Sequence, residues 1–255
     1  MTDLDEIHAV ARELAWAGRW RRALSLLDTT DGGFQTAVTA AEVALESDVF
    51  CGTELAAGRL AAAARLGTSW DLDFLHLRQN YFSLLQIDGT WTPGPGGKDP
   101  AALEELRSRA ERMAERAPDP VRHGWARHYQ GLTADNLLGR PELAPPHYQA
   151  ALAAGEDTDP RLEREALRHL GGHDRDNGDL AAAYQKWARA TALSAQAGLV
   201  PGLLTQLILL AVLARDEGDE AGAAMLAREI ARAAEAIGAH RPYAQARSFL
   251  SDVPR

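Results

Sequence analysis

Two histidines four residues apart, His169 and His173, lie in the segment RHLGGHDRDNGD, with three aspartates close behind. Residues at this spacing share one face of a helix, so their imidazoles can reach a single metal ion. A metal site would need a third ligand, and the candidates are Asp174, Asp176 and His128. The pair lacks the glutamate of an HExxH motif. Three interpretations stay open: a metal site of His169, His173 and Asp174, acid–base or ligand-binding roles for His128, His169 and His173, and structural histidines.

Motifs of conventional catalysis are otherwise missing from the sequence, which contains no GxSxG, GxxxxGK[ST] or GxGxxG pattern. Cys51, the only cysteine, has no histidine near it in sequence, so we do not expect a catalytic thiol. No cofactor is implied. A single cysteine suits a reducing compartment, and the acidic start MTDLDEIHAV has no features of a signal peptide, so we expect a cytoplasmic protein.

The segment GTWTPGPGGKDP, residues 89–100, is too rich in glycine and proline to form a helix. It is also longer than most connections between helices. We interpret it as an inserted loop. Trp91 and Lys98 within it are candidates for a lid over a binding face, and the alternative is a tolerated insertion without a role.

Charge and composition exclude several classes of partner. The chain of 255 residues carries a formal net charge of −9, whereas nucleic-acid binding needs clustered lysine and arginine. We therefore expect a neutral or cationic partner. The most apolar stretch, residues 199–214, is interrupted by Pro201, Thr205 and Gln206 and is shorter than the roughly 20 residues of a membrane span. It predicts a buried helix and no membrane partner.

Apolar residues recur at spacings of three and four nearly throughout the chain, which predicts an all-α protein. Short segments containing glycine or proline interrupt this pattern and mark helix ends. The interruptions predict about thirteen helices, each of roughly 11 to 19 residues. We expect residues 1–255 to form a single domain.

Internal repeats appear when the sequence is aligned on three glycines, Gly18, Gly178 and Gly218. Each copy has a small residue seven positions before the glycine and an alanine five positions after it. The segment around Gly139 gives a fourth copy. Successive copies are 39 residues apart from Gly139 to Gly178 and 40 apart from Gly178 to Gly218.

Leu170, Gly171, Gly178, Ala183 and Trp187 match the pattern of the tetratricopeptide repeat, and the chain resembles that family most clearly over residues 125–237. The extended repeats are also similar to those of stand-alone repeat proteins of actinobacteria. The resemblance implies a right-handed superhelical array of antiparallel helix pairs. It makes Asn177–Gly178–Asp179 the turn within one pair, and makes residues 240–251 a capping helix.

In tetratricopeptide proteins the first helix of each pair lines a concave groove. By alignment, the groove-lining residues are Tyr129, Thr133, Asn136, Arg168, His169, Gly172, Arg175, Asp176, Arg215 and Asp216. The arginines would clamp a carboxylate, a peptide C-terminus or a phosphate. The alternative is a surface network in which they pair with neighbouring aspartates.

Two functions follow from these expectations. The first is an interaction module that holds a peptide or protein partner in an open groove. The second is a binding protein or enzyme that encloses a small molecule and uses His128, Arg168, His169 and His173 on it. A buried pocket and shifted histidine pKa values would indicate the second. An apolar patch at either end of the array leaves a homodimer open.

Overall fold

The computed structural model describes residues 3–87 and 90–252. Within these residues it has thirteen α-helices and one two-stranded hairpin, which confirms the all-α class and the expected number of helices. The helices are α1 (Leu4–Trp16), α2 (Trp20–Asp28), α3 (Gly33–Cys51), α4 (Ala56–Ala64), α5 (Trp70–Leu85), α6 (Pro100–Glu115), α7 (Pro120–Leu132), α8 (Pro145–Gly155), α9 (Pro160–Asp176), α10 (Leu180–Gln196), α11 (Val200–Asp216), α12 (Glu220–Ala236) and α13 (His240–Ser251). The remaining elements are β1 (Gln86–Ile87), β2 (Thr90–Trp91), the π-helix η1 (Thr133–Leu137) and the 3-10 helix η2 (Pro141–Leu143).

The turn between α9 and α10 follows from its sequence as expected. Gly178 has a φ of +83°, a left-handed conformation that glycine adopts without steric cost. Asp179 caps α10, because its carboxylate accepts a hydrogen bond from the Ala182 N–H. Asp219 caps α12 in the same way. Both turns thus end one helix and begin the next.

The small residues of the repeat pattern are required by close helix packing. A Cβ atom added at Gly171 would lie 2.5 Å from Nε1 of Trp187, so α9 and α10 could not approach as closely with a larger residue. Gly131 and Tyr148 repeat this relationship between α7 and α8, where the added Cβ would lie 2.6 Å from the ring. Trp187 and Tyr148 are both almost fully buried.

The fourth repeat differs by one residue, and η1 accounts for the difference. Gly131 precedes Gly139 by eight positions, whereas Gly171 precedes Gly178 by seven. The π-helical turn over Thr133–Leu137 accommodates one more residue than an α-helical turn. The insertion also places Asn136 at the centre of the molecule, as described below.

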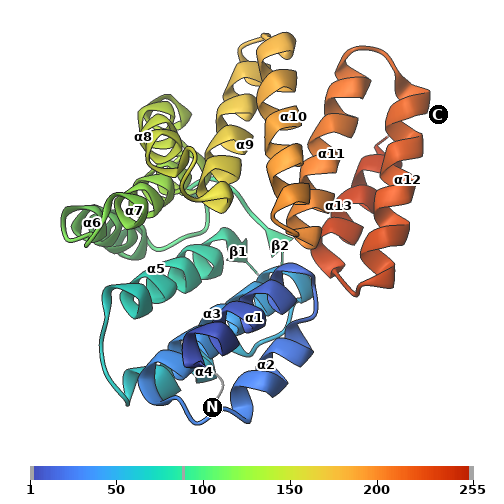
Figure 1. The fold of residues 1–255 in the computed structure, drawn as a ribbon. Helices are drawn as coiled ribbons and strands as arrows, with labels where there is room; N and C mark the ends of the chain where they lie inside the picture. The colour runs from blue at the N-terminus through green and yellow to red at the C-terminus, as the bar shows by residue number, and fades with distance from the viewer. Residues whose placement is uncertain (1–2, 88–89, 253–255) are drawn as a thin grey trace.

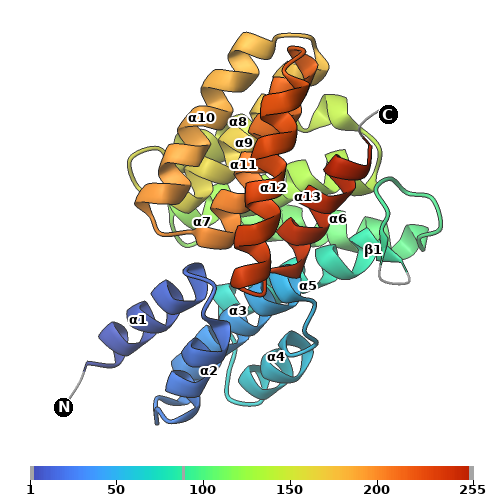
Figure 2. The ribbon, with the colours of Figure 1, turned by 90° about the vertical axis from the view of Figure 1, so that its right-hand side faces the viewer.

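Consecutive helices pack against each other, and the whole array curves until its two ends meet (Figure 1). The last helix, α13, contacts α3, and α1 contacts α11. The Cys51 thiol donates to the carbonyl oxygen of Gly238 at 3.1 Å across this junction. In Figure 2 the N-terminal helices lie beneath the ends of α11–α13. The helix expected as a cap is present, and it also joins the two ends of the array.

The most apolar segment forms α11, which is buried along much of its length. None of the helices in the described parts of the chain has the length and hydrophobicity needed to cross a membrane.

Candidate functional site

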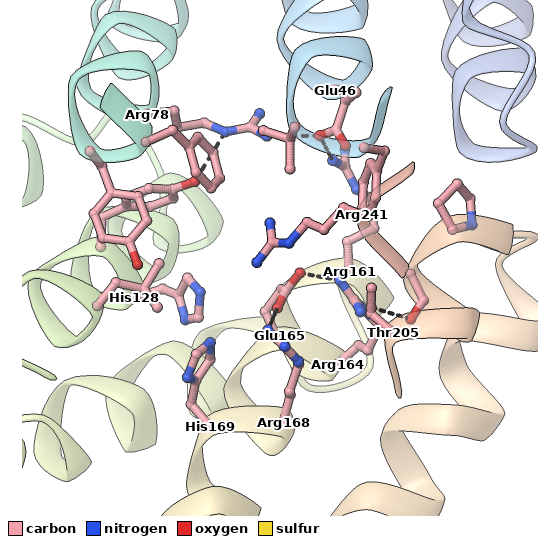
Figure 3. A pocket seen from close by; sticks show the side chains of 18 of the residues that line it. Glu46, Arg78, His128, Arg161, Arg164, Glu165, Arg168, His169, Thr205 and Arg241 are labelled. Atoms are coloured by element: carbon pink, nitrogen blue, oxygen red, sulfur yellow. Dashed lines mark hydrogen bonds and ion pairs between the residues drawn. The ribbon is translucent and has the colours of Figure 1, made fainter. Parts of the chain in front are cut away.

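A cavity of about 350 Å³ lies at the centre of the curved array. Helices from both halves of the chain line it, among them α3, α5, α7, α9, α11 and α13, together with η1 and β2 (Figure 3). The cavity therefore depends on the meeting of the two ends, because α3 and α13 contribute to the same wall.

Helix α9 supplies one charged side of the cavity. Its lining residues are Arg161, Arg164, Glu165, Arg168 and His169. Arg161 is followed after three and four residues by Arg164 and Glu165, and these are followed after four residues by Arg168 and His169, so all five share one face of the helix. The cavity side of α9 is thus a continuous polar stripe, and most of its charge is positive.

Arg78 of α5 provides a guanidinium on the opposite side. Its Nη2 lies 2.7 Å from Glu46 of α3, and its Nε donates to the hydroxyl of Tyr129 at 3.2 Å. Burial disfavours the charge, but Tyr129 and Glu46 outweigh this effect and raise the pKa of Arg78. Glu46 also pairs with Arg161 at 3.3 Å, which links α3, α5 and α9 across the cavity.

Arg241 of α13 points into the middle of the cavity (Figure 3). Its guanidinium carbon lies 3.9 Å from the ring centroid of Trp91 in β2. Burial, followed by the charge of Arg168, lowers the pKa of Arg241 to about 10. No carboxylate of residues 3–87 or 90–252 forms an ion pair with it.

Positive charge exceeds negative charge at this site. The charged side chains that line the cavity are five arginines and two glutamates: Arg78, Arg161, Arg164, Arg168, Arg241, Glu46 and Glu165. The local excess is three positive charges in a chain with a net charge of −9. The overall charge predicted a neutral or cationic partner, and the cavity has the opposite character.

Several cavity arginines have unused hydrogen-bond donors. Within the described residues, Nε and Nη1 of Arg164 and Nε of Arg168 are buried and have no partner. Glu165 neutralises part of their charge, since one of its oxygens pairs with Arg164. Burial opposes the ionisation of Glu165, but Arg164 and Arg168 outweigh it and lower its pKa to about 2. Unpaired buried donors are costly, so an acceptor supplied by a ligand would stabilise them.

Two histidines with lowered pKa values complete the site. His128 of α7 is 2% exposed, and burial lowers its pKa to about 4. Its Nδ1 is buried and has no hydrogen-bond partner in the part of the chain that the structure describes. His169 stacks on Tyr148 with ring centroids 4.9 Å apart, and burial lowers its pKa well below the usual value. Both imidazoles are therefore neutral at pH 7.

The predicted histidine pair separates in the structure. His169 faces the cavity, where it approaches His128 with ring centroids 5.4 Å apart. His173 instead places its Nε2 3.3 Å from Asp135, and Asp174 pairs with Lys186 at 2.5 Å.

The ring of Tyr148 packs against both His169 and His173. The metal set of His169, His173 and Asp174 is therefore not brought together. Among the described residues, the potential ligand atoms of His128, Glu165 and His169 lie within 4.8 Å of one another instead.

The predicted groove residues divide into two groups. Tyr129, Asn136, Arg168 and His169 line the cavity, and Asn136 donates to the hydroxyl of Tyr81 at 2.8 Å. Thr133 of η1 is buried, and its hydroxyl donates to the carbonyl oxygen of Tyr129 in the preceding turn, so it needs no partner in the cavity.

The remaining groove residues lie away from the cavity. Arg175 pairs with Asp216, Asp176 is exposed, and Arg215 donates to the carbonyl oxygen of Phe249 at 2.8 Å. Arg175 and Asp216 thus form the kind of surface ion pair that the alternative interpretation predicts. These positions lie near the C-terminal ends of α9 and α11, so they do not line the cavity.

The two predicted lid residues have different roles. Trp91 lines the cavity beneath Arg241. Lys98 donates from Nζ to the carbonyl oxygens of Thr92 and Gly94, both at 2.6 Å, so it organises the loop itself. The loop is also fixed to η1, because the Gly94 N–H donates to the carbonyl oxygen of Asn136 at 2.8 Å. The part of the predicted loop at residue 89 lies outside the described residues.

Cys51 lies at the junction of the two chain ends and does not line the cavity. Burial raises the pKa of its thiol, which disfavours the reactive thiolate. This position gives no support to a catalytic thiol.

No family model matches the chain, and no curated protein matches it.

Proposed function

We propose that the central cavity binds a small organic anion. The observation that carries this proposal is the excess of positive charge, because a cavity with three more guanidiniums than carboxylates lies inside an acidic chain. Guanidiniums bind carboxylates and phosphates through paired hydrogen bonds. Burial of an unpaired arginine is unfavourable, so an anion bound beside it would stabilise the protein.

The lining also favours an anion with an apolar part. Trp91, Phe82, Leu85 and Leu132 form a wall beside the arginines. Ligand sites commonly combine an apolar lining with a few convergent polar groups. A cavity of about 350 Å³ suits a small metabolite better than a folded partner. An organic acid or a phosphate monoester with a hydrocarbon or aromatic body fits this combination.

The sequence alone favoured an open groove for a peptide or protein, and the resemblance to tetratricopeptide repeats stays a prediction. Contacts of α13 with α3 and of α1 with α11 close the array around the cavity and so support the small-molecule alternative. Shifted pKa values of His128 and His169 support it as well.

The proposal is tested by thermal unfolding of the purified chain in the presence of matched anions and neutral analogues. Succinate is compared with succinamide, phenylacetate with phenylacetamide, and glycerol phosphate with glycerol. An anion present at about 100 times its Kd should stabilise the protein by about 2.7 kcal/mol, which raises Tm by about 5 to 10 °C. Its neutral analogue should leave Tm unchanged. Native mass spectrometry of the same samples measures the stoichiometry.

Variants locate the binding site. Arg168→Met should remove the anion-dependent shift, because Arg168 lines the cavity. The matched control is Arg175→Met on the same helix, whose guanidinium pairs with Asp216 outside the cavity. The proposal fails if neither carboxylates nor phosphate monoesters raise Tm, or if both variants reduce the shift equally.

A further inference from the structure

The cluster of His128, Glu165 and His169 is not explained by anion binding alone. Their ligand-type atoms lie within 4.8 Å of one another, and they come from two facing helices, α7 and α9. Glu165 and His169 are one helical turn apart, so both side chains project from the same face. Two imidazoles and one carboxylate are a common ligand set for divalent transition metals.

His128 and Glu165 each have an electron pair that no described residue uses. Nδ1 of His128 is buried and makes no hydrogen bond within the described residues, although His128 is only 2% exposed. In Glu165 the Oε1 atom pairs with Arg164, whereas Oε2 lies 3.9 Å from Arg168, which is too far for a hydrogen bond. An unpartnered ring nitrogen and an unbonded carboxylate oxygen therefore remain for an ion.

The two imidazoles of the cluster lie close together, with their ring centroids 5.4 Å apart. His128 belongs to α7 and His169 to α9, so the two facing helices each supply one ring to the same part of the cavity. Figure 3 shows the two rings and Glu165 on neighbouring sides of the same part of the cavity.

The surrounding arginines oppose a bare cation. Arg164 and Arg168 flank Glu165, and Arg241 projects toward the same space. The positive charges of these guanidiniums would repel a metal cation, and the repulsion is stronger in a buried site than in water. A divalent ion would be accepted when an anion held by the arginines neutralises them and fills the remaining coordination positions.

We propose that His128, Glu165 and His169 bind a divalent transition-metal ion together with the anion in the cavity. This inference rests on the proposed anion site and adds a metal ion that binds beside the anion. Three protein ligands leave positions open for an oxygen of the anion, which is the arrangement of metal sites that bind a further ligand. The anion would thus be one that carries a metal-binding oxygen, such as a carboxylate or phosphate.

The experiment is a titration of the full chain with Co²⁺, followed by visible absorbance, first with Co²⁺ alone and then with succinate at equal free Co²⁺. We expect one Co²⁺ per chain, bound at least about tenfold more tightly with succinate. The variants Glu165→Gln and His169→Asn should weaken Co²⁺ binding by at least about 100-fold. Circular dichroism of each variant verifies its fold.

The matched controls are His173→Asn and Asp174→Asn, which change neighbouring potential ligands that face Asp135 and Lys186. Both should bind Co²⁺ as the wild type does. Co²⁺ binding that survives Glu165→Gln and His169→Asn, or that is absent with and without succinate, overturns the metal site. Equal affinity with and without succinate overturns joint binding.

Failure of the metal site can be separated from failure of the anion site. Succinate and the other anions are also tested by thermal unfolding in a buffer containing a chelator. An anion-dependent rise in Tm without any Co²⁺ binding would support the anion site and contradict the metal site. If anions do not raise Tm and Co²⁺ does not bind, both proposals are contradicted.

Discussion

The guanidinium of Arg241 lies over the ring of Trp91, with 3.9 Å between its central carbon and the ring centroid. This contact joins the last helix of the array to the hairpin that follows α5. An arginine on an aromatic face is stabilised by the ring electrons and keeps its hydrogen-bond donors free at the edge. Trp91 therefore holds Arg241 in place without neutralising its charge, and the charge remains available to a ligand.

Replacement of Arg241 by methionine should raise the stability of the ligand-free protein and weaken anion binding. Among the described residues Arg241 has no carboxylate partner for its buried charge, so Arg241→Met should stabilise the ligand-free protein by about 1 to 3 kcal/mol. The same variant should lose most of the Tm increase caused by anions. Urea unfolding with and without succinate measures both effects. A variant that is less stable than the wild type and still responds to succinate would contradict this account of Arg241.

The local structure of the repeats could be read from sequence because it depends on residues close together in the chain. Gly178 and Asp179 make the turn between α9 and α10, and Gly171 accommodates Trp187, as the repeat pattern indicates. The number of helices followed from the same signals. These features depend on helix capping and on contacts between neighbouring helices, both of which have short-range signatures.

The closure of the array could not be predicted in this way. It depends on small rotations that accumulate from repeat to repeat, and on contacts between α13 and α3 that no local pattern encodes. Arg241 was therefore missed, since closure brings it to the cavity. Arg78 was missed because its partners, Glu46 and Tyr129, lie on other helices and share no local pattern with it. Arg164 and Glu165 had a signal, because they continue the polar face of Arg168 and His169 by one turn.

Two adjacent glycines of α9 should respond oppositely to alanine. A Cβ at Gly171 would lie 2.5 Å from Trp187, so Gly171→Ala should destabilise the protein by about 1 to 3 kcal/mol. A Cβ at Gly172 meets no described atom within 4 Å, so Gly172→Ala should stabilise it by about 0.5 to 1 kcal/mol through helix propensity. Urea unfolding of both variants provides the comparison. Equal effects would show that α9 and α10 are not packed this closely.

Lys98 should control the order of the loop that carries Trp91. Its ammonium group bonds two carbonyl oxygens of the loop, those of Thr92 and Gly94. Lys98→Met removes both hydrogen bonds, so we expect faster hydrogen exchange over residues 90–98 and about tenfold weaker anion binding. Hydrogen-exchange mass spectrometry and the succinate titration measure these two effects. Faster exchange with unchanged anion affinity would mean that the loop is not part of the binding site.

The stability of the protein should fall between pH 6.5 and pH 4 because of His128. Its pKa is about 4 in the folded protein and close to 6.5 in the unfolded chain. Burial is the main cause, because it disfavours the charged ring. Glu165 raises the pKa, whereas Arg164, Arg168 and Arg78 lower it further. The unfolded chain therefore binds more protons in this range, and the free energy of unfolding decreases as pH falls.

His128→Asn should remove about 2 to 3 kcal/mol of this pH dependence. The pKa of His169 is also lowered by burial, so His169 contributes in the same direction. The free energy of unfolding of His128→Asn should therefore still decrease as pH falls, but less steeply than that of the wild type. Urea unfolding of the wild type and His128→Asn at pH 7 and pH 4.5, without added anions, measures the difference. Equal losses of stability in the two proteins would show that His128 is not held neutral in the cavity.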